Sequence, residues 1–153
     1  MSVLRFSWLG PPAIEVDGFP LRPEMRKTLA LLAYLSLSPQ SLSRETLATL
    51  FWPEFDQQHS LTNLRRNLYS LARSLPPGLL ETDREKISLR REDWLLLDVA
   101  EFRQQLSMVK EHSHSPDRIC PDCLASLEKA AAVVWTNIPQ ITPTADTMPA
   151  LRP

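Results

Sequence analysis

Hydrophobic residues change their spacing along this chain, and these changes divide it into segments. Near the N-terminus, apolar residues alternate with polar ones at Leu4, Phe6 and Trp8, and apolar residues return over positions 13–16 after two prolines. Alternation of this kind is typical of strands buried on one face. Asp17-Gly18 follows, and this pair favours a two-residue hairpin turn because both residues tolerate positive φ. The sequence therefore predicts a small antiparallel sheet at the start of the chain.

After Pro23 the spacing of apolar residues becomes helical. Residues 25–37 are apolar nearly all round, so we expect this first helix to be buried at the centre of the fold. The second helix begins after Ser43, whose hydroxyl suits an N-cap. It ends at Trp52, because Pro53 disfavours helical geometry in the residue before it.

Residues 59–75 form a predicted third helix, with leucines spaced three and four apart along one side. Asp56 or Ser60 suits its N-cap, and the Pro-Pro-Gly sequence at 76–78 ends it. The opposite side carries arginine, amide and hydroxyl groups, and the segment contains no acidic residue. We therefore expect one buried apolar face and one exposed cationic face.

A second hairpin is predicted after this helix, because apolar residues over 80–90 flank a charged centre at 83–86. A sheet, three helices and a hairpin in this order are typical of the winged helix-turn-helix. The sequence thus predicts an α+β fold in which residues 1–95 form a winged-helix domain.

The remainder is expected to be a helical segment over residues 96–135 and a disordered or extended tail over residues 136–153. Asp98 opens a sequence with capping-box spacing, so we expect it to be the N-cap of a helix that runs to about residue 110. A polar loop and a last helix over residues 124–134 follow. The tail is rich in proline and threonine and buries too little apolar surface to order itself.

The composition narrows the classes of function. The formal net charge is −1 and the isoelectric point is near 6.3, so nucleic-acid binding would need a local basic patch. No apolar run approaches the roughly 18 residues of a membrane span, and no signal-peptide pattern is present, so we expect a cytoplasmic protein. The sequence has no glycine-flanked nucleophile or phosphate-binding loop. We expect neither an enzyme nor a cofactor or small-molecule substrate.

The exposed side of the third predicted helix fits the major groove of double-stranded DNA. Arginine can form paired hydrogen bonds with guanine, and asparagine with adenine. We therefore expect base contacts from Asn63, Arg66 and Ser70. Groups at the helix edge, in its first turn or on the hairpin tip would reach the DNA backbone instead. These predicted backbone contacts are Ser60, Thr62, Arg65, Tyr69, Arg73, Arg84 and Lys86.

In their order and spacing, five stretches resemble the antibiotic-regulatory-protein (SARP) family of bacterial transcriptional regulators. They are LRFSWLGPP at 4–12, RKTLALLAYL at 26–35, LFWPE at 50–54, NLRRNL at 63–68 and LDVAEF at 97–102. The resemblance covers roughly residues 3–134. Each stretch alone is a loose, leucine-rich string, and the family pattern lies in their arrangement.

The resemblance implies an OmpR-type winged helix joined to an all-helical bacterial transcriptional activator domain. It further implies homodimers on direct repeats near promoters and recruitment of RNA polymerase. The corresponding polymerase-facing loop here contains Glu54, Phe55 and Asp56. After residue 134 the sequence departs from the family pattern, so we expect only a shortened part of the activator domain.

Two alternatives stay open. Cys120 and Cys123 have the spacing of half a zinc site or of a thioredoxin-like redox pair, but the redox motif would need a strand before its helix. His112 and His114 lie nearby and could complete a zinc site, but such a cluster would be unusual in so short a loop, and we expect no metal. The second alternative is a protein-interaction module, or a remnant that pairs with other regulators without binding DNA. It predicts a stable complex that forms in the absence of DNA.

Overall fold

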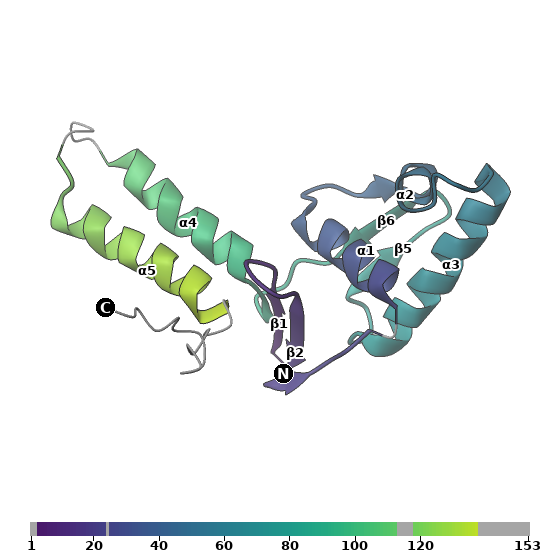
Figure 1. Cartoon of the computed structure of the whole chain (residues 1–153), viewed down its shortest axis with the longest axis horizontal. Coiled ribbons are helices and arrows are strands. Elements are labelled where there is room, and N and C mark those ends of the chain that lie inside the picture. Colours follow the sequence, from purple (N-terminus) through teal and green to yellow (C-terminus); the bar gives the residue numbers. More distant parts are fainter. Residues whose placement is uncertain (1–2, 24, 113–117, 138–153) are drawn as a thin grey trace, which may run out of the picture.

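The computed structural model describes residues 3–23, 25–112 and 118–137 and has two parts (Figure 1). One part contains two small sheets and three helices, and the other is a pair of helices that extends away from it. The expected fold class is confirmed: the chain is α+β with a winged-helix-like arrangement. None of the described helices is long and apolar enough to cross a membrane.

The first sheet has the strand order β3-β2-β1-β7 and contains the predicted N-terminal hairpin. Strand β1 (Leu4–Ser7) pairs antiparallel with β2 (Ala13–Val16), and the short β3 (Phe19–Pro20) continues the sheet. Asp17 and Gly18 have φ values of 52° and 80°, as the predicted hairpin turn requires. The hairpin predicted from alternation is therefore present.

A strand that was not predicted closes the other edge of this sheet. Strand β7 (Leu95–Leu97) runs parallel to β1, with Leu4 opposite Leu95 and Phe6 opposite Leu97. Parallel strands require a long connection, and here almost the whole winged-helix-like part lies between them. Periodicity did not indicate β7 because three consecutive leucines fit a helix as well as a strand.

Three helices and a second sheet complete the winged-helix-like part. The helices are α1 (Arg26–Leu37), α2 (Arg44–Phe51) and α3 (Gln57–Ser74). The predicted second hairpin, the wing, is formed by β5 (Leu80–Thr82) and β6 (Lys86–Leu89). It is extended by β4 (Leu42–Ser43), which pairs with β6 and was not predicted, since two residues carry no periodicity.

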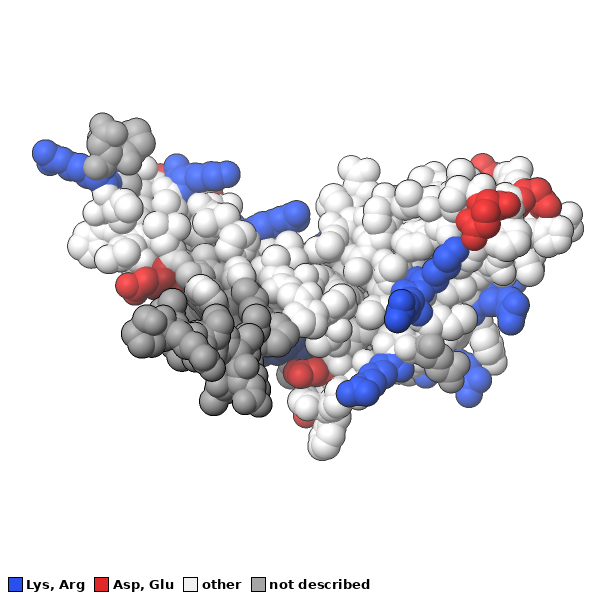
Figure 2. Space-filling model, viewed as in Figure 1, with Lys and Arg blue, Asp and Glu red and all other residues white. Residues whose placement is uncertain are grey.

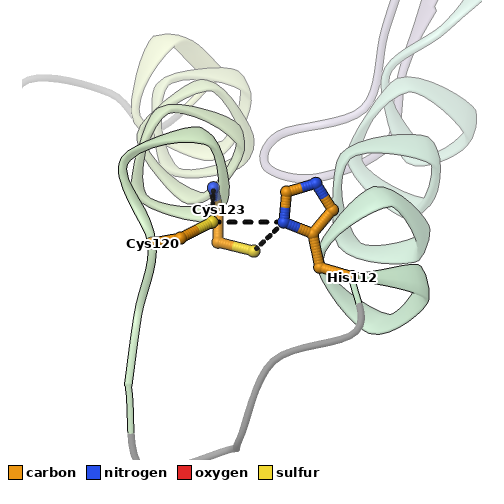
Figure 3. A group of neighbouring side chains, drawn as sticks. All are labelled: His112, Cys120 and Cys123. Carbon is orange, nitrogen blue, oxygen red and sulfur yellow. Dashed lines mark hydrogen bonds between the residues drawn. The ribbon is translucent and has the colours of Figure 1, made fainter.

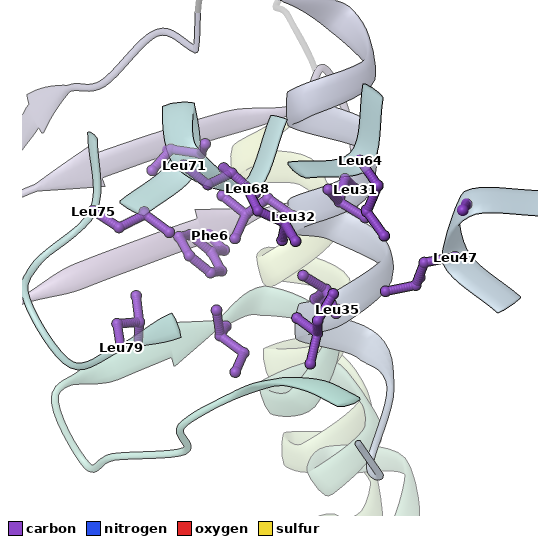
Figure 4. Packing of buried hydrophobic residues seen from close by; sticks show 14 of the residues in the cluster. Phe6, Leu31, Leu32, Leu35, Leu47, Leu64, Leu68, Leu71, Leu75 and Leu79 are labelled. Carbon is purple, nitrogen blue, oxygen red and sulfur yellow. The ribbon is translucent and has the colours of Figure 1, made fainter. Parts of the chain in front are cut away.

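Leucines from different elements fill one core (Figure 4). The stripe predicted on the third helix is buried at Leu64, Leu68 and Leu71, and Leu61 packs partly buried against the same core. Helix α1 contributes Leu31, Leu32 and Leu35. Its buried surface is one face, because Tyr34 and Leu37 are exposed, so the expectation that this helix is buried all round was too broad.

The helical pair consists of α4 (Asp98–Glu111) and α5 (Pro121–Asn137), which lie side by side in Figure 1. Helix α5 begins before and ends after the predicted range of 124–134. Thr136 and Asn137, the first two residues of the expected tail over 136–153, are therefore helical, and the rest of that tail lies outside the described residues.

Asp98 does not cap α4, and this expectation was wrong. Leu97 occupies the N-cap position and makes no side-chain cap bond. The Asp98 carboxylate instead accepts hydrogen bonds from the backbone N–H groups of Trp8 and Leu9, both at 2.8 Å. Its side chain thus joins the start of α4 to the loop after β1, and this buried contact connects the two parts of the chain.

Candidate nucleic-acid interface

The first turn of α3 is held by Asp56 and Ser60. Asp56 is the N-cap, and its carboxylate accepts a hydrogen bond of 3.0 Å from the backbone N–H of His59 and also contacts the His59 ring. These contacts, led by the His59 N–H, lower the pKa of the Asp56 carboxyl below its ordinary value. Helix α3 therefore begins at Gln57, two residues earlier than predicted.

Ser60 is buried and does not face outward. Its hydroxyl donates to the carbonyl oxygen of Trp52 at 2.8 Å and also lies 3.3 Å from that of Phe55. This hydroxyl ties α3 to the end of α2 and is not available to a phosphate. The expected backbone contact from Ser60 is therefore wrong, because the residue was chosen for its place in the first turn, whereas it lies on the buried side of the helix.

A buried pair of polar side chains anchors α3 against α1. The Thr28 hydroxyl donates to Asn67 Oδ1 at 2.7 Å, and Asn67 Nδ2 donates to the carbonyl oxygen of Asn63 at 2.9 Å. Thr28 and Asn67 are 1% and 6% exposed, so neither is easily satisfied by water instead. These bonds fix the rotation of α3 about its axis and hence the direction of its outer face.

The outer face of α3 gathers most of the predicted DNA-contacting residues. One hollow on the surface is lined by Arg65, Arg66, Tyr69, Ser70 and Arg73, together with Met25 and Ser74. Asn63 and Arg66 line an adjoining hollow toward the start of α1. The Arg73 guanidinium lies 5.9 Å from the centre of the Tyr69 ring, within cation–π range. Figure 2 shows blue Lys and Arg side chains over this part of the molecule.

Three arginines on this face are not neutralised by the protein. Arg65, Arg66 and Arg73 are exposed, and within residues 3–23, 25–112 and 118–137 none of them forms an ion pair. Thr62 is exposed as predicted, although its hydroxyl donates to the carbonyl oxygen of Gln58 at 2.9 Å. The face therefore combines unneutralised positive charge with polar side chains.

The two wing residues that were predicted together lie on different surfaces. Arg84, at the hairpin tip, lines a hollow that also includes Arg65, so it lies beside the outer face of α3. Lys86 lines a separate hollow with Ser41 and Glu81. The tip is stiffened by Asp83, whose carboxylate accepts from the backbone N–H groups of Lys86 and Glu85, which lowers the pKa of that carboxyl.

Sequence reasoning missed cations that approach α3 from other elements. Arg26 and Lys27 line the hollow that holds Asn63 and Arg66, and Arg44 lines the one shared by Arg65 and the wing tip. Arg26 is exposed at the first position of α1. A signal was present in the sequence, since Pro23 placed the start of α1 near these cations, but only tertiary packing brings that end to α3.

The loop predicted to face RNA polymerase is exposed at Glu54, Phe55 and Asp56. Glu54 pairs with Lys27 at 3.1 Å, and its pKa is lowered first by a hydrogen bond from its own backbone N–H and then by Lys27. Lys27 also lies 5.3 Å from the centre of the buried Trp52 ring. The loop is thus held against α1 and presents one aromatic ring between two carboxylates.

A second cluster of functional side chains lies at the far end of the helical pair (Figure 3). His112, at the end of α4, points its Nδ1 toward Cys120 Sγ at 3.1 Å and Cys123 Sγ at 3.3 Å. The N–H of Cys123 lowers the pKa of Cys120 to about 7, whereas burial raises the pKa of Cys123. No disulfide joins the two described sulfurs. His114, the other histidine near the two cysteines in the sequence, lies outside the described residues.

Comparison with solved structures places this fold among known ones. The chain is similar to Mycobacterium tuberculosis EmbR in complex with low affinity phosphopeptide, with a TM-score of 0.61 and 20% sequence identity. The match covers 90% of this chain and 36% of that chain, so this chain spans about a third of its length. At this identity the likeness shows a shared fold, which agrees with the architecture implied by the SARP resemblance. No family model and no curated protein matches the chain.

Proposed function

We propose that this chain is a sequence-specific, DNA-binding regulator of transcription related to the SARP family. The observation that carries the proposal is the outer face of α3, where three arginines are exposed without an ion pair among the described residues. A helix of this kind, with a wing beside it, fits the major groove of double-stranded DNA. The fold shared with EmbR supports the proposal at the level of architecture.

Base contacts are assigned to Asn63, Arg66 and Ser70. Arg66 lines both hollows on the outer face of α3, one with Asn63 and the other with Ser70, so these side chains adjoin one another. A guanidinium that reaches a guanine edge bonds O6 and N7 together, and an amide can do the same for adenine N6 and N7. The hydrogen bonds of Asn67 fix the rotation of α3 about its axis, and in this orientation the three side chains would face the groove.

Phosphate contacts are assigned to Thr62, Arg65, Tyr69 and Arg73 along α3, and to Arg84 on the wing. Arg65 lines the hollow shared with Arg84, which suits two cations that follow one phosphate backbone. Lys86 would contribute only through a different surface. Homodimers on direct repeats, and RNA polymerase at the loop of Glu54, Phe55 and Asp56, are the partners that the family resemblance adds to this proposal.

The test is binding of the full chain to fragments selected from genomic DNA, measured over a range of salt concentration. Three phosphate-contacting arginines predict a slope of log affinity against log salt of about −2.7, at −0.9 for each contact. Replacing Arg66 by alanine should cost about 1–3 kcal/mol on the selected site and relax the preference for one base.

Arg65→Ala provides the matched comparison, because Arg65 is the neighbouring arginine on the same face. It should weaken binding equally on all sequences and reduce the salt slope by about 0.9. Arg90→Ala is a control on the wing, since Arg90 is paired with Glu81 at 2.9 Å. Binding that ignores salt, or selection that enriches no sequence, contradicts the proposal.

Exposed apolar side chains on the helical pair favour a second candidate function, a protein-interaction module. Leu124 and Trp135 on α5 are 50% and 64% exposed, and Met108 on α4 is 49% exposed. This function predicts a stable protein complex without DNA, which is lost when Trp135 and Leu124 are changed to serine. Arg66→Ala would leave that complex unchanged.

A further inference from the structure

Three potential metal ligands lie close together at the end of α4 and the start of α5 (Figure 3). They are His112 Nδ1, Cys120 Sγ and Cys123 Sγ, and these atoms all lie within 4.8 Å of one another. His112 directly follows α4, Cys120 directly precedes α5, and Cys123 lies in the first turn of α5. The donors thus lie at the end of α4 and at the start of α5, so one ion bound by all three would join the two helices.

The distances between the donors suit one tetrahedral ion. Zinc bonds of about 2.3 Å to sulfur and 2.0 Å to nitrogen, at a tetrahedral angle, separate the two donors by about 3.5 Å. The two nitrogen–sulfur distances are 3.1 Å and 3.3 Å, so a small outward shift of the exposed imidazole would complete the geometry. Cys120 Sγ also accepts from the N–H of Cys123 at 3.3 Å, as thiolate ligands commonly do.

We propose that His112, Cys120 and Cys123 bind one zinc ion, with water in the fourth coordination position. Two thiolates and one neutral imidazole are the nitrogen and sulfur ligands that zinc prefers. On binding, Zn²⁺ forms two bonds to sulfur and one to nitrogen, and the two thiol protons pass to solvent. The resulting site has no net charge, which suits the position of Cys123, a residue only 2% exposed.

The ion would act as a clamp on the helical pair. The buried residues described on α5 are Cys123, Ser126 and Ala130, and such small side chains bury little apolar area against α4. At the other end, the start of α4 is held by the buried Asp98 carboxylate. A metal at His112 would close the opposite end of the pair, where Cys123 Sγ also donates to the carbonyl oxygen of Val109 at 4.0 Å. Zinc thus stabilises α4 and α5 independently of DNA binding by α3.

A cation titration of the reduced, untagged full chain tests this site. Co²⁺ is the spectroscopic probe, because a tetrahedral site with thiolates gives intense visible bands and a sulfur-to-metal charge-transfer band. We expect one Co²⁺ per chain, displaced by one Zn²⁺. With Zn²⁺ bound, backbone amides of α4 and α5 should exchange hydrogen more slowly, whereas those of α3 should be unchanged.

Variants distinguish the proposed zinc ligands from residues that do not bind the ion. His112→Asn and Cys120→Ser change exposed or half-buried residues, so both chains should fold, and each should weaken zinc binding by more than the roughly 10- to 100-fold that loss of an outer-shell partner costs. His59→Asn is the matched control, because His59 is also exposed but lies on α3. Its zinc affinity should equal that of the unchanged chain.

The spectrum also reports which donors bind. Cys120→Ser should lose about half of the charge-transfer intensity, whereas His112→Asn should keep the sulfur band while releasing the metal more easily. The proposal is overturned if the reduced chain binds no zinc or cobalt, or if His112→Asn binds as tightly as His59→Asn. It is equally overturned if the two thiols oxidise to a disulfide at the same rate with and without zinc.

Discussion

Replacement of Asp98 by alanine should destabilise the fold, because its side chain holds residues that are distant in the sequence. The carboxylate is 6% exposed and accepts two hydrogen bonds of 2.8 Å from the backbone N–H groups of Trp8 and Leu9, about ninety residues away. It also accepts from the N–H of Val99 at 2.7 Å. The alanine variant would leave the two distant N–H groups without this acceptor in a partly buried position.

The expected cost follows from these two long-range bonds. A hydrogen bond to a charged acceptor contributes about 1.5–3 kcal/mol to stability, so two fully buried bonds of this kind would contribute about 3–6 kcal/mol. Water can reach part of the Trp8 and Leu9 backbone, because both residues are half-buried. We therefore expect a loss of about 3 kcal/mol for Asp98→Ala. Asp98→Asn should lose about half of that, because both long-range bonds go to one oxygen, Oδ2, which the amide oxygen can replace only as an uncharged acceptor.

Equilibrium urea unfolding of the full chain measures this loss, and hydrogen exchange locates it. The amides of Trp8 and Leu9 should lose protection in Asp98→Ala, while that of Leu71 should follow the global stability only. Asp93→Ala serves as the control, because Asp93 is an exposed acidic residue near the same junction. A stability of Asp98→Ala within about 0.5 kcal/mol of the unchanged chain would refute the role assigned to this carboxylate.

Two further changes test how α3 is held. Thr28→Val should cost about 1–3 kcal/mol in urea unfolding, because the buried Asn67 Oδ1 loses its donor, whereas Thr62→Val on the exposed face should change little. Asp56→Ala should lower stability at neutral pH through the lost N-cap bond to His59. Since the folded pKa of Asp56 is lowered from about 3.8, its contribution is complete above that value and disappears as the pH falls below it. The two urea midpoints should therefore converge in acid, and a constant difference would contradict the assignment.

Signals that depend on neighbouring residues predicted the fold well. The Asp17-Gly18 turn, the Ser43 cap that accepts from Thr46 at 3.0 Å and the leucine stripe of α3 all match the structure. Each is decided within a few residues, by backbone φ, by a cap side chain or by helical spacing. Together they were sufficient for the order of elements that defines the winged-helix-like part.

Contacts between residues that are distant in the sequence could not be predicted from such local signals. Asp98 has the spacing of a capping box, yet its carboxylate finds stronger partners in a loop that the parallel pairing of β1 and β7 brings beside it. Ser60 is polar but lies on the side of α3 that meets the end of α2. In both cases the residue type was compatible with two roles, and tertiary packing decided between them.

The candidate DNA site shows how a chain of net charge −1 can still present a cationic surface. Asp56 and Glu54 lie at the N-terminal end of α3, about 14 Å along the helix from Arg66 at 1.5 Å per residue. This separation exceeds the Debye length of about 8 Å at physiological salt, so the carboxylates are largely screened from a phosphate held at the middle of the helix. The two carboxylates remain close to the first turn of α3, where Asp56 already accepts the hydrogen bond of the His59 N–H. The phosphate contact expected at the helix N-terminus is therefore disfavoured, and the DNA backbone should follow the central and C-terminal turns of α3, where Arg65 and Arg73 lie.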